Sequence, residues 1–395
     1  MSNKVPQIRF NGYSDAWEER KFKNFISKSG RRNKTGELTE AYSVSNTLGL
    51  VKQSDQFNGS RLDSLDKKDY KIVQPNEFAY NPARINVGSI AFNNLDKPVI
   101  VSSLYVIVNM SDTLNNQFIL HWLKSPAFNY EVIRNTEGSV REYLFYENFS
   151  NVSFPYTPNY DEQIKIGQFF NQLDNTIALH QRKLDLLKEQ KKGYLQKMFP
   201  KNGAKVPELR FAGFADDWEQ RKLGDLLKEF SIKSKIEDEH KVLSSTNSGM
   251  EFREGRVSGT SNLGYKIIKN GDLVLSPQNL WLGNININNI GKGLVSPSYK
   301  TFELINIDSS FINPQLRTQK MLEEYKNSST QGASVVRRNL EIDSFYQIKI
   351  FVPTISEQEK IGSFFQQLDN TIVLHQRKLD LLKEQKKGFL QKMFV

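Results

Sequence analysis

The feature of this sequence that most limits its fold is a long, charged segment that occurs twice. Residues 162–199 align with residues 357–394 at an offset of 195, and only five of these 38 positions differ. The two copies contain "LDNTIALHQRKLDLLKEQKKG" and "LDNTIVLHQRKLDLLKEQKKG", whereas the sequences between them are largely unrelated. The chain is therefore a two-fold repeat in which a fixed segment alternates with a variable region.

A second repeat opens each half. "VPQIRFNGYSDAWEERKF" from Val5 parallels "VPELRFAGFADDWEQRKL" from Val206. A weaker correspondence inside the variable regions places Gly88 opposite Gly283. These repeats divide the chain into a first variable domain (1–160), a first fixed helix (161–200), a second variable domain (201–355) and a second fixed helix (356–395).

The fixed segment has the heptad pattern of a coiled coil, because its apolar positions recur at alternating steps of four and three residues. We expect two helices of about 36 residues, each about 54 Å long, packed antiparallel with the halves in pseudo-two-fold arrangement. His180 and His375 lie in the predicted seam, where a polar residue usually fixes register. The seam consists of Ile166, Phe170, Leu173, Ile177, His180, Leu184 and Leu187 in the first copy, and of Ile361, Phe365, Leu368, Ile372, His375, Leu379 and Leu382 in the second.

The variable regions contain short apolar runs broken by Gly, Pro and Asn, together with segments of helical spacing, which is typical of mixed α/β domains. Residues 98–110 read as one buried strand, and residues 115–128 and 311–325 as helices, the first ending near Pro126. The predicted fold class is α+β, with two mixed α/β domains separated by two long helices that form an antiparallel coiled coil.

Composition narrows the function classes. The chain has no cysteine, which excludes disulfides, thiolate metal sites and cysteine nucleophiles. A formal net charge of +10 suits a polyanionic partner, nucleic acid before membrane. The first residues lack the apolar core of a signal peptide, and no apolar run is long enough to span a bilayer. We therefore expect a cytoplasmic protein.

Catalytic motifs are incomplete. "NPAR" and "SPSY" each lack the second proline of the amino-methyltransferase motif, and no Gly-rich loop precedes them to bind S-adenosylmethionine. "GKG" has neither the leading glycine nor the Ser/Thr of a phosphate-binding loop. The sequence predicts a non-catalytic chain with no bound cofactor and no metal site.

Polar side chains near positive charge are the candidates for contact with double-stranded DNA. Asn and Gln pair with adenine in the major groove, and Arg and Lys contact phosphates. An ordinary solvent loop or edge strand explains the same patterns, and that alternative stays open. The candidates are Arg31, Arg32, Lys34, Ser45, Asn46, Asn81, Arg84, Asn86 and Arg141 in the first half, and Ser245, Thr246, Asn247, Gln278, Asn279, Trp281, Asn284, Arg337 and Arg338 in the second.

The motifs "VPELRFAGFADDWEQRKLGD" and "PTISEQEKIGSFFQQLDNTI", each with a partner in the first half, resemble the specificity subunit of type I restriction–modification enzymes. The resemblance covers essentially the whole chain. It implies two target-recognition domains, each reading one half of an asymmetric bipartite DNA site, and a coiled coil that sets the spacer between the half-sites.

The resemblance also implies partners. Two methylation subunits carrying S-adenosylmethionine would dock near the fixed helices and methylate adenine by base flipping. Two restriction subunits would add translocation and cleavage that depend on ATP and Mg. Two other classes remain as alternatives: a structural coiled-coil scaffold with accessory α/β domains, and a self-contained DNA methyltransferase or nuclease, which the missing motifs disfavour.

Overall fold

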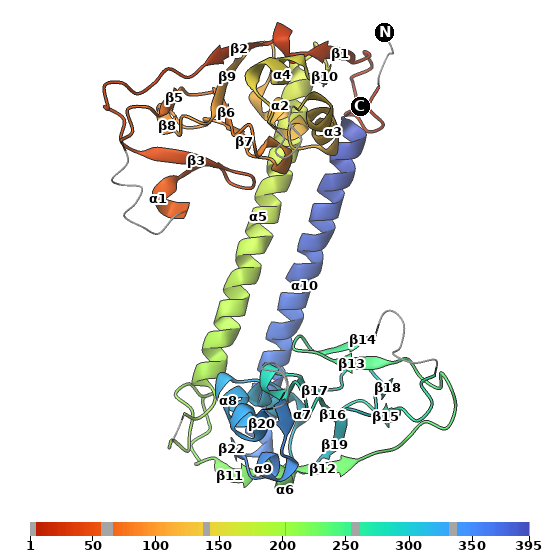
Figure 1. Cartoon of the computed structure of the whole chain (residues 1–395). Coiled ribbons are helices and arrows are strands. Elements are labelled where there is room, and N and C mark those ends of the chain that lie inside the picture. Colours follow the sequence, from red (N-terminus) through yellow and green to blue (C-terminus); the bar gives the residue numbers. More distant parts are fainter. Residues whose placement is uncertain are drawn as a thin grey trace. The chain divides into compact units, whose positions relative to one another are not determined.

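The computed structural model divides the chain into two compact units (Figure 1). The first unit holds residues 1–181 and 377–395, and the second holds residues 182–376. Each unit therefore contains one variable region, the beginning of one long helix and the end of the other. The residues that the structure describes are 5–56, 66–136, 143–201, 203–253, 261–331 and 338–394.

The first unit is built on small sheets with helices packed against them. In pairing order, the described strands form β2 (Ile26–Ser29), β9 (Val106–Met110), β6 (Phe78–Tyr80) and β7 (Ile90–Phe92); β4 (Gly49–Lys52), β3 (Ala41–Ser45), β8 (Val99–Val101) and β5 (Lys71–Val73); and β1 (Glu18–Lys21) with β10 (Ser153–Tyr156). The described helical segments before the long helix are η1 (Phe22–Asn24), α1 (Gln53–Gln56), η2 (Ile85–Val87), α2 (Asn116–Trp122), α3 (Pro126–Asn135) and α4 (Tyr146–Asn151).

The second unit repeats this plan. Its described sheets are β12 (Leu227–Phe230), β19 (Lys300–Leu304), β16 (Leu273–Leu275) and β17 (Ile285–Ile287); β13 (Leu243–Ser245) with β14 (Met250–Phe252); β15 (Lys266–Ile268) with β18 (Gly293–Val295); β11 (Glu219–Lys222) with β22 (Lys349–Val352); and β20 (Ser329–Gln331) with β21 (Arg338–Leu340). Its short helical segments are α6 (Leu223–Leu226), η3 (Leu280–Leu282), α7 (Ser309–Leu316), α8 (Gln319–Asn327) and α9 (Ile342–Tyr346). The α+β class expected from the sequence is confirmed.

Two expectations about single elements were wrong. The predicted strand 98–110 is two strands, β8 and β9, because a turn closed by Tyr105 N–H and the Ser102 carbonyl (3.1 Å) interrupts the apolar run. The predicted helix 115–128 ends at Trp122, and Pro126 begins α3 instead, with the Ser125 hydroxyl accepting from Phe128 N–H. This arrangement follows from proline's fit to the first helical turn after a serine cap.

The predicted helix 311–325 is likewise two helices. α7 ends at Leu316 and α8 begins at Gln319, with Arg317 and Thr318 between them. Pro314 lies inside α7 and removes one backbone donor near its end, which favours an early stop.

Each unit closes around an aromatic core to which both long helices contribute. In the first unit, Phe170 of α5 (Tyr160–Lys197) stacks on Phe394, which follows α10 (Ile355–Met393), at 5.8 Å between ring centroids. In the second unit, Phe365 stacks on Phe199 at 5.9 Å. Both units therefore depend on the start of one long helix and the end of the other.

Within each unit the two helix segments run antiparallel and share the predicted seam. In the first unit, Phe169 meets Phe389 and Asp174 meets Lys386, so positions rise along one helix as they fall along the other. In the second unit, Tyr194 meets Phe364 and Lys191 meets Asp369. Eight seam residues are buried, namely Ile166, Phe170, Leu184, Leu187, Ile361, Phe365, Leu379 and Leu382, and the other six are half-buried.

Two lysines of the seam make short ion pairs. Lys386 Nζ lies 2.5 Å from Asp174 Oδ1 in the first unit, and Lys191 Nζ lies 2.5 Å from Asp369 Oδ1 in the second. A charged residue in a coiled-coil seam is stable only where its partner stands opposite, so these pairs fix the register. Among the described residues no helix is apolar enough over sufficient length to cross a membrane.

Candidate nucleic-acid interface

The first unit presents a hairpin with a polar tip. Strands β3 and β4 pair from Tyr42–Lys52 to Ser45–Gly49. The Ser45 hydroxyl accepts from the backbone N–H groups of Thr47 and Leu48 (3.3 and 3.2 Å), which holds the tip in a compact turn. Asn46 is exposed, and Leu48 is 74% exposed. The hairpin thus offers one amide and one apolar side chain to a partner.

A helical turn next to the hairpin carries the other candidates of the first unit. The Asn81 side chain accepts from Ala83 N–H (3.0 Å), and Gly88 closes the turn with φ of 85°, a conformation that glycine adopts without strain. Ile85 is buried, whereas Arg84 and Asn86 are exposed. The buried residue anchors the turn and leaves its neighbours free to contact a partner.

The turn and the hairpin are joined. The Ser89 hydroxyl donates to the Val44 carbonyl (3.3 Å). A Cβ atom on Gly88 would lie 3.6 Å from Cβ of Asn46. The two elements therefore present one continuous polar surface.

The second unit builds the same pair of elements from different side chains. Gly283 closes the equivalent turn with φ of 89°, and Leu280 is its buried anchor. The exposed or half-buried residues of this turn and its flanks are Gln278, Asn279, Trp281 and Asn284. The β13–β14 tip carries half-buried Thr246 and exposed Asn247, and the Arg317 guanidinium donates to the Asn247 carbonyl.

Ser245 does not face solvent. It is 2% exposed, and its hydroxyl accepts from Asn286 Nδ2 (2.8 Å) and donates to the Val274 carbonyl (3.4 Å). Asn288 is fully buried, and its amide donates to the carbonyls of Lys269 and Gly291. These three residues therefore support the hairpin from inside, so the run of asparagines in the sequence is partly structural.

The basic loop after β2 is ordered by one buried amide. Asn33 is 1% exposed and donates to the carbonyls of Leu38 (2.7 Å) and Lys67 (3.3 Å). Arg31, Arg32 and Lys34 around it are exposed, and Arg32 pairs with the exposed Asp69 (2.9 Å). The loop thus holds three cations at the surface.

The remaining arginine candidates divide into two groups. Arg338 donates to the Ser329 hydroxyl (2.9 Å) and to the carbonyls of Ser329 and Lys326 (3.0 and 3.3 Å), so its guanidinium closes the end of α8. This internal use leaves it little capacity for a phosphate. Arg141 and Arg337 lie outside the described residues.

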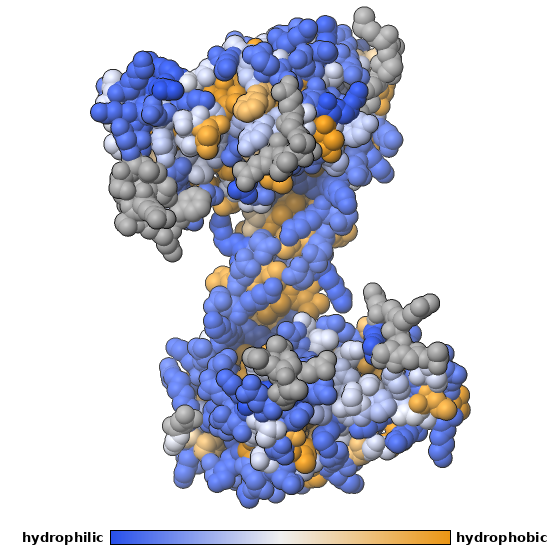
Figure 2. All heavy atoms as spheres, in the orientation of Figure 1, coloured by the Kyte–Doolittle hydropathy of each residue, from blue (hydrophilic) through white to orange (hydrophobic). Residues whose placement is uncertain are grey.

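An exposed leucine pair on the long helices was not singled out from the sequence. Leu179 and Leu381 in the first unit are 65% and 52% exposed, and their equivalents Leu374 and Leu186 in the second unit are 67% and 51% exposed. Each stands two residues after a seam position, so in an antiparallel pair both leucines of a unit flank the same side of the seam. Figure 2 shows hydrophobic residues on the exposed surface of these helices. Their recurrence at an offset of 195 was the available signal.

Metal chemistry finds no support in the described ranges, where no group of three His, Asp or Glu side chains could hold an ion. The features that the two units share are instead a fixed frame and, on it, exposed side chains that differ. This combination defines a class of tandem-repeat proteins whose halves present different surfaces to a partner.

The chain belongs to the family of the type I restriction modification DNA specificity domain. The family's model matches twice, over residues 14–189 and 215–384. The two matches coincide with the two halves of the repeat.

Individual relatives carry the same description. The chain is 22% identical over 249 residues to the putative type I restriction enzyme MjaX specificity subunit of Methanocaldococcus jannaschii, covering 59% of this chain and 56% of the relative. It is 27% identical over 207 residues to the MjaVIII specificity subunit of the same organism, covering 49% and 44%. The chain spans about half the length of these curated relatives.

Solved structures share the fold. The S subunit of a type I restriction–modification system from M. genitalium superposes with a TM-score of 0.65 at 16% identity, over 99% of both chains. A structure described as showing the assembly and conformational transition of the type I system superposes with a TM-score of 0.51 at 14% identity, over 95% of this chain and 97% of the other.

Proposed function

We propose that this chain is the non-catalytic specificity subunit of a type I restriction–modification complex in the cytoplasm, and that each unit reads one half of an asymmetric bipartite DNA site. The observation that carries the proposal is the repeated turn beside a hairpin. Its anchors are equivalent in the two units, Ile85 with Leu280 and Gly88 with Gly283, whereas the exposed residues differ. Equal frames with unequal side chains suit two half-sites of unequal sequence.

Base recognition is assigned to the side chains at these turns and tips. In the first unit these are Arg84 and Asn86, with Asn46 and Asn81 beside them. Arg pairs bidentately with guanine, and Asn or Gln with adenine. The corresponding residues of the second unit are Gln278, Asn279, Asn284 and Asn247, with Thr246 and Trp281 completing the surface. Arg31, Arg32 and Lys34 contact phosphates, which position the protein but carry no sequence information.

The long helices set the distance between the half-sites. A helix of 38 residues such as α5 is about 57 Å long at 1.5 Å rise per residue. Half-sites one helical turn apart on DNA, about 34 Å, present the same groove face. The near-identity of the helices gives both halves the same relation to the spacer.

Two methylation subunits bind the helices, one at each exposed leucine pair. Unpartnered leucines at such exposure are unusual on a helix surface and typical of a protein interface. The identity of the pairs in the two units suits two identical partners. S-adenosylmethionine belongs to the methylation subunits, and two restriction subunits supply the steps that need ATP and Mg, so this chain binds no cofactor of its own.

Methylation mapping tests the proposal. The full chain is co-expressed with a type I methylation subunit, and modified adenines are located on the host genome by single-molecule sequencing. The proposal expects a new, asymmetric split motif with a fixed gap. A stable complex that produces no new methylation would instead favour a coiled-coil scaffold without DNA recognition.

A further inference from the structure

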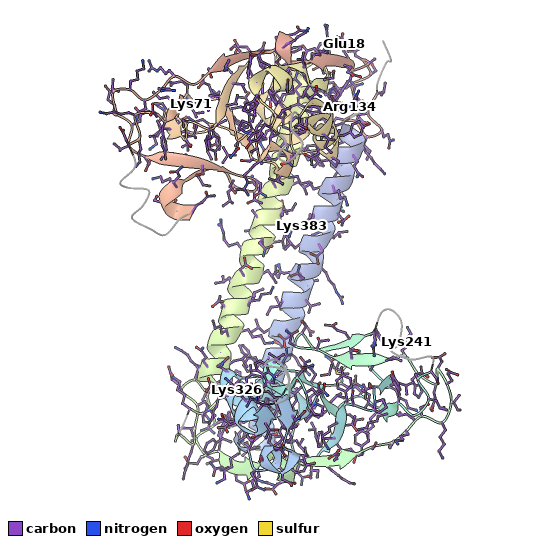
Figure 3. All side chains as sticks on the ribbon, viewed as in Figure 1. Glu18, Lys71, Arg134, Lys241, Lys326 and Lys383 are labelled. Carbon is purple, nitrogen blue, oxygen red and sulfur yellow. The ribbon has the colours of Figure 1, made fainter. Side chains whose placement is uncertain are left out.

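A half-buried lysine stands among other cations at one edge of the first unit. Lys71 begins β5 and is labelled beside that strand in Figure 3. Its ammonium donates to the Tyr105 carbonyl (2.6 Å), and its backbone bridges to Arg32. Burial lowers the pKa of Lys71, and the charges of Lys28 and Arg32 lower it further.

The positive charge of this cluster is only slightly offset. Arg32 pairs with Asp69, but both side chains are more than half exposed, so the pair is weak in water. The printed contact of the Lys28 ammonium is with the Tyr146 ring, at 5.5 Å. An anion placed between Lys28 and Lys71 would relieve the repulsion that crowds them.

The second unit shows what fills the equivalent position. Lys266 matches Lys71: its ammonium donates to the Tyr299 carbonyl (2.6 Å), and its backbone bridges to a basic residue, Lys233. Glu229 stands where the first unit has Lys28, since each pairs with the matching position of the neighbouring strand, Phe302 or Val108.

The Glu229 carboxylate serves as a built-in anion. It accepts from Lys300 Nζ (2.7 Å) and from the Tyr346 hydroxyl (3.1 Å), and its charge raises the pKa of Lys266 against the lowering by burial. Lys266 is also only 8% exposed, so it is closed to a large ligand. The second unit therefore satisfies internally the position that the first unit leaves open.

We propose that Lys28, Arg32 and Lys71 bind one phosphate of the DNA backbone, and that the second unit has no such site. The inference rests on the proposed DNA-binding function and adds an asymmetry to it: the first unit holds its half-site with one more backbone contact. DNA is the favoured source of the phosphate because the chain carries a net charge of +10 and backbone contacts dominate the affinity of such proteins.

The test measures how DNA binding depends on salt, using the full chain with its methylation subunits and a duplex that carries the mapped site. The variant Lys28→Glu introduces the carboxylate of the second unit and leaves the bond from Lys71 to Tyr105 intact. We expect the slope of log affinity against log salt to fall by about one. The methylated motif should not change, because phosphate contacts carry no sequence information.

The reciprocal variant is the matched control. Glu229→Lys removes the built-in anion and should leave the slope unchanged or steeper, and Lys266→Met should leave it unchanged. Thermal unfolding of each variant separates loss of fold from loss of contact. A folded Lys28→Glu variant with the wild-type slope overturns the inference, as does an equal loss of slope in Lys266→Met.

Two further outcomes are distinct. If inorganic phosphate raises the melting temperature of the wild type but not of Lys28→Glu, while the two slopes agree, the site takes free phosphate and the assignment to DNA is wrong. If the wild-type complex shows no sequence-selective binding at all, the proposed function itself fails, irrespective of this site.

Discussion

His121 is the one buried histidine of the first unit for which a role in matching domain to helix can be argued. It is 2% exposed, and its Nε2 lies 3.1 Å from Asn171 Oδ1 on α5. Asn171 is one of the five positions at which the two fixed segments differ, and the second copy has Gln366 there. This difference falls where the variable region touches the helix, so the helix is adapted to its own domain at this point.

Replacing Asn171 with the residue of the second copy tests this match. In Asn171→Gln the longer side chain displaces the amide from the ring, and loss of the hydrogen bond should lower the free energy of unfolding by about 1–2 kcal/mol. Chemical denaturation measures the change. The reverse substitution Gln366→Asn is the control, for which we expect a smaller effect. Equal stability of Asn171→Gln and the wild type would show that the pair contributes nothing.

The same histidine predicts a dependence of stability on pH. Burial lowers the pKa of His121 to about 4, against smaller effects of Asn171 and Asp174 that raise it and of Lys386 and Lys124 that lower it. Between the unfolded value near 6.5 and about 4, the unfolded chain binds a proton that the folded chain does not. Stability should therefore decrease as pH falls through this window, by up to about 1.4 kcal/mol per pH unit, and His121→Gln should reduce that slope. An unchanged slope in the variant would assign the effect to other groups.

At the scale of elements, a buried arginine–glutamate pair ties the opening repeat of each half to a long helix. Arg9 makes two bonds to the Glu162 carboxylate (2.6 and 2.9 Å), which also accepts from the Trp17 indole (3.2 Å). Arg210 and Glu357 repeat the pair in the second unit (2.7 and 2.8 Å). The opening motif is retained in both halves because it holds the start of the helix.

Breaking this pair should be costly. Arg9→Met leaves the fully buried Glu162 carboxylate without its cation, and we expect a loss of about 3 kcal/mol in the free energy of unfolding. Arg20→Met, whose partner Glu18 is exposed, should cost about 1 kcal/mol or less. Denaturation curves of the two variants, recorded side by side, measure the difference. If both variants melt together, the pair is no stronger than a surface contact.

The elements also show how far the sequence could lead. The long helices were predictable because an uninterrupted heptad pattern needs no tertiary information. The break between β8 and β9 was not, since the turn at Tyr105 contains no glycine or proline. The start of α3 was signalled by Ser125 and Pro126, a cap followed by the residue that best begins a helix, but the apolar spacing was read across it.

The candidate interface was predictable in outline only. The correspondence of Gly88 with Gly283 placed the turn, because only the backbone of that turn had to be kept. Alternation along 284–289 suggested an edge strand with exposed amides. In the structure β17 is covered on both faces, so Asn286 points inward. A sequence pattern does not reveal that a second layer covers a polar face.

On the scale of the whole molecule, the account requires a partner at the exposed leucines. The double variant Leu179→Lys and Leu374→Lys places a charge in each pair, and we expect it to abolish binding of methylation subunits while the fold is kept. Co-purification with a tagged methylation subunit measures this. Leu104→Lys, at a residue that is 74% exposed in the first variable region, is the matched control. Normal complex formation by the double variant would move the docking site elsewhere.

The central claim is that each unit reads one half-site independently, and an exchange of one variable region tests it most directly. Residues 24–155 are replaced with the corresponding region of a relative, and the methylated motif is mapped by single-molecule sequencing beside that of the wild type. The account predicts that one half of the split motif changes while the other half stays the same. A change in both halves, or in neither, would contradict it.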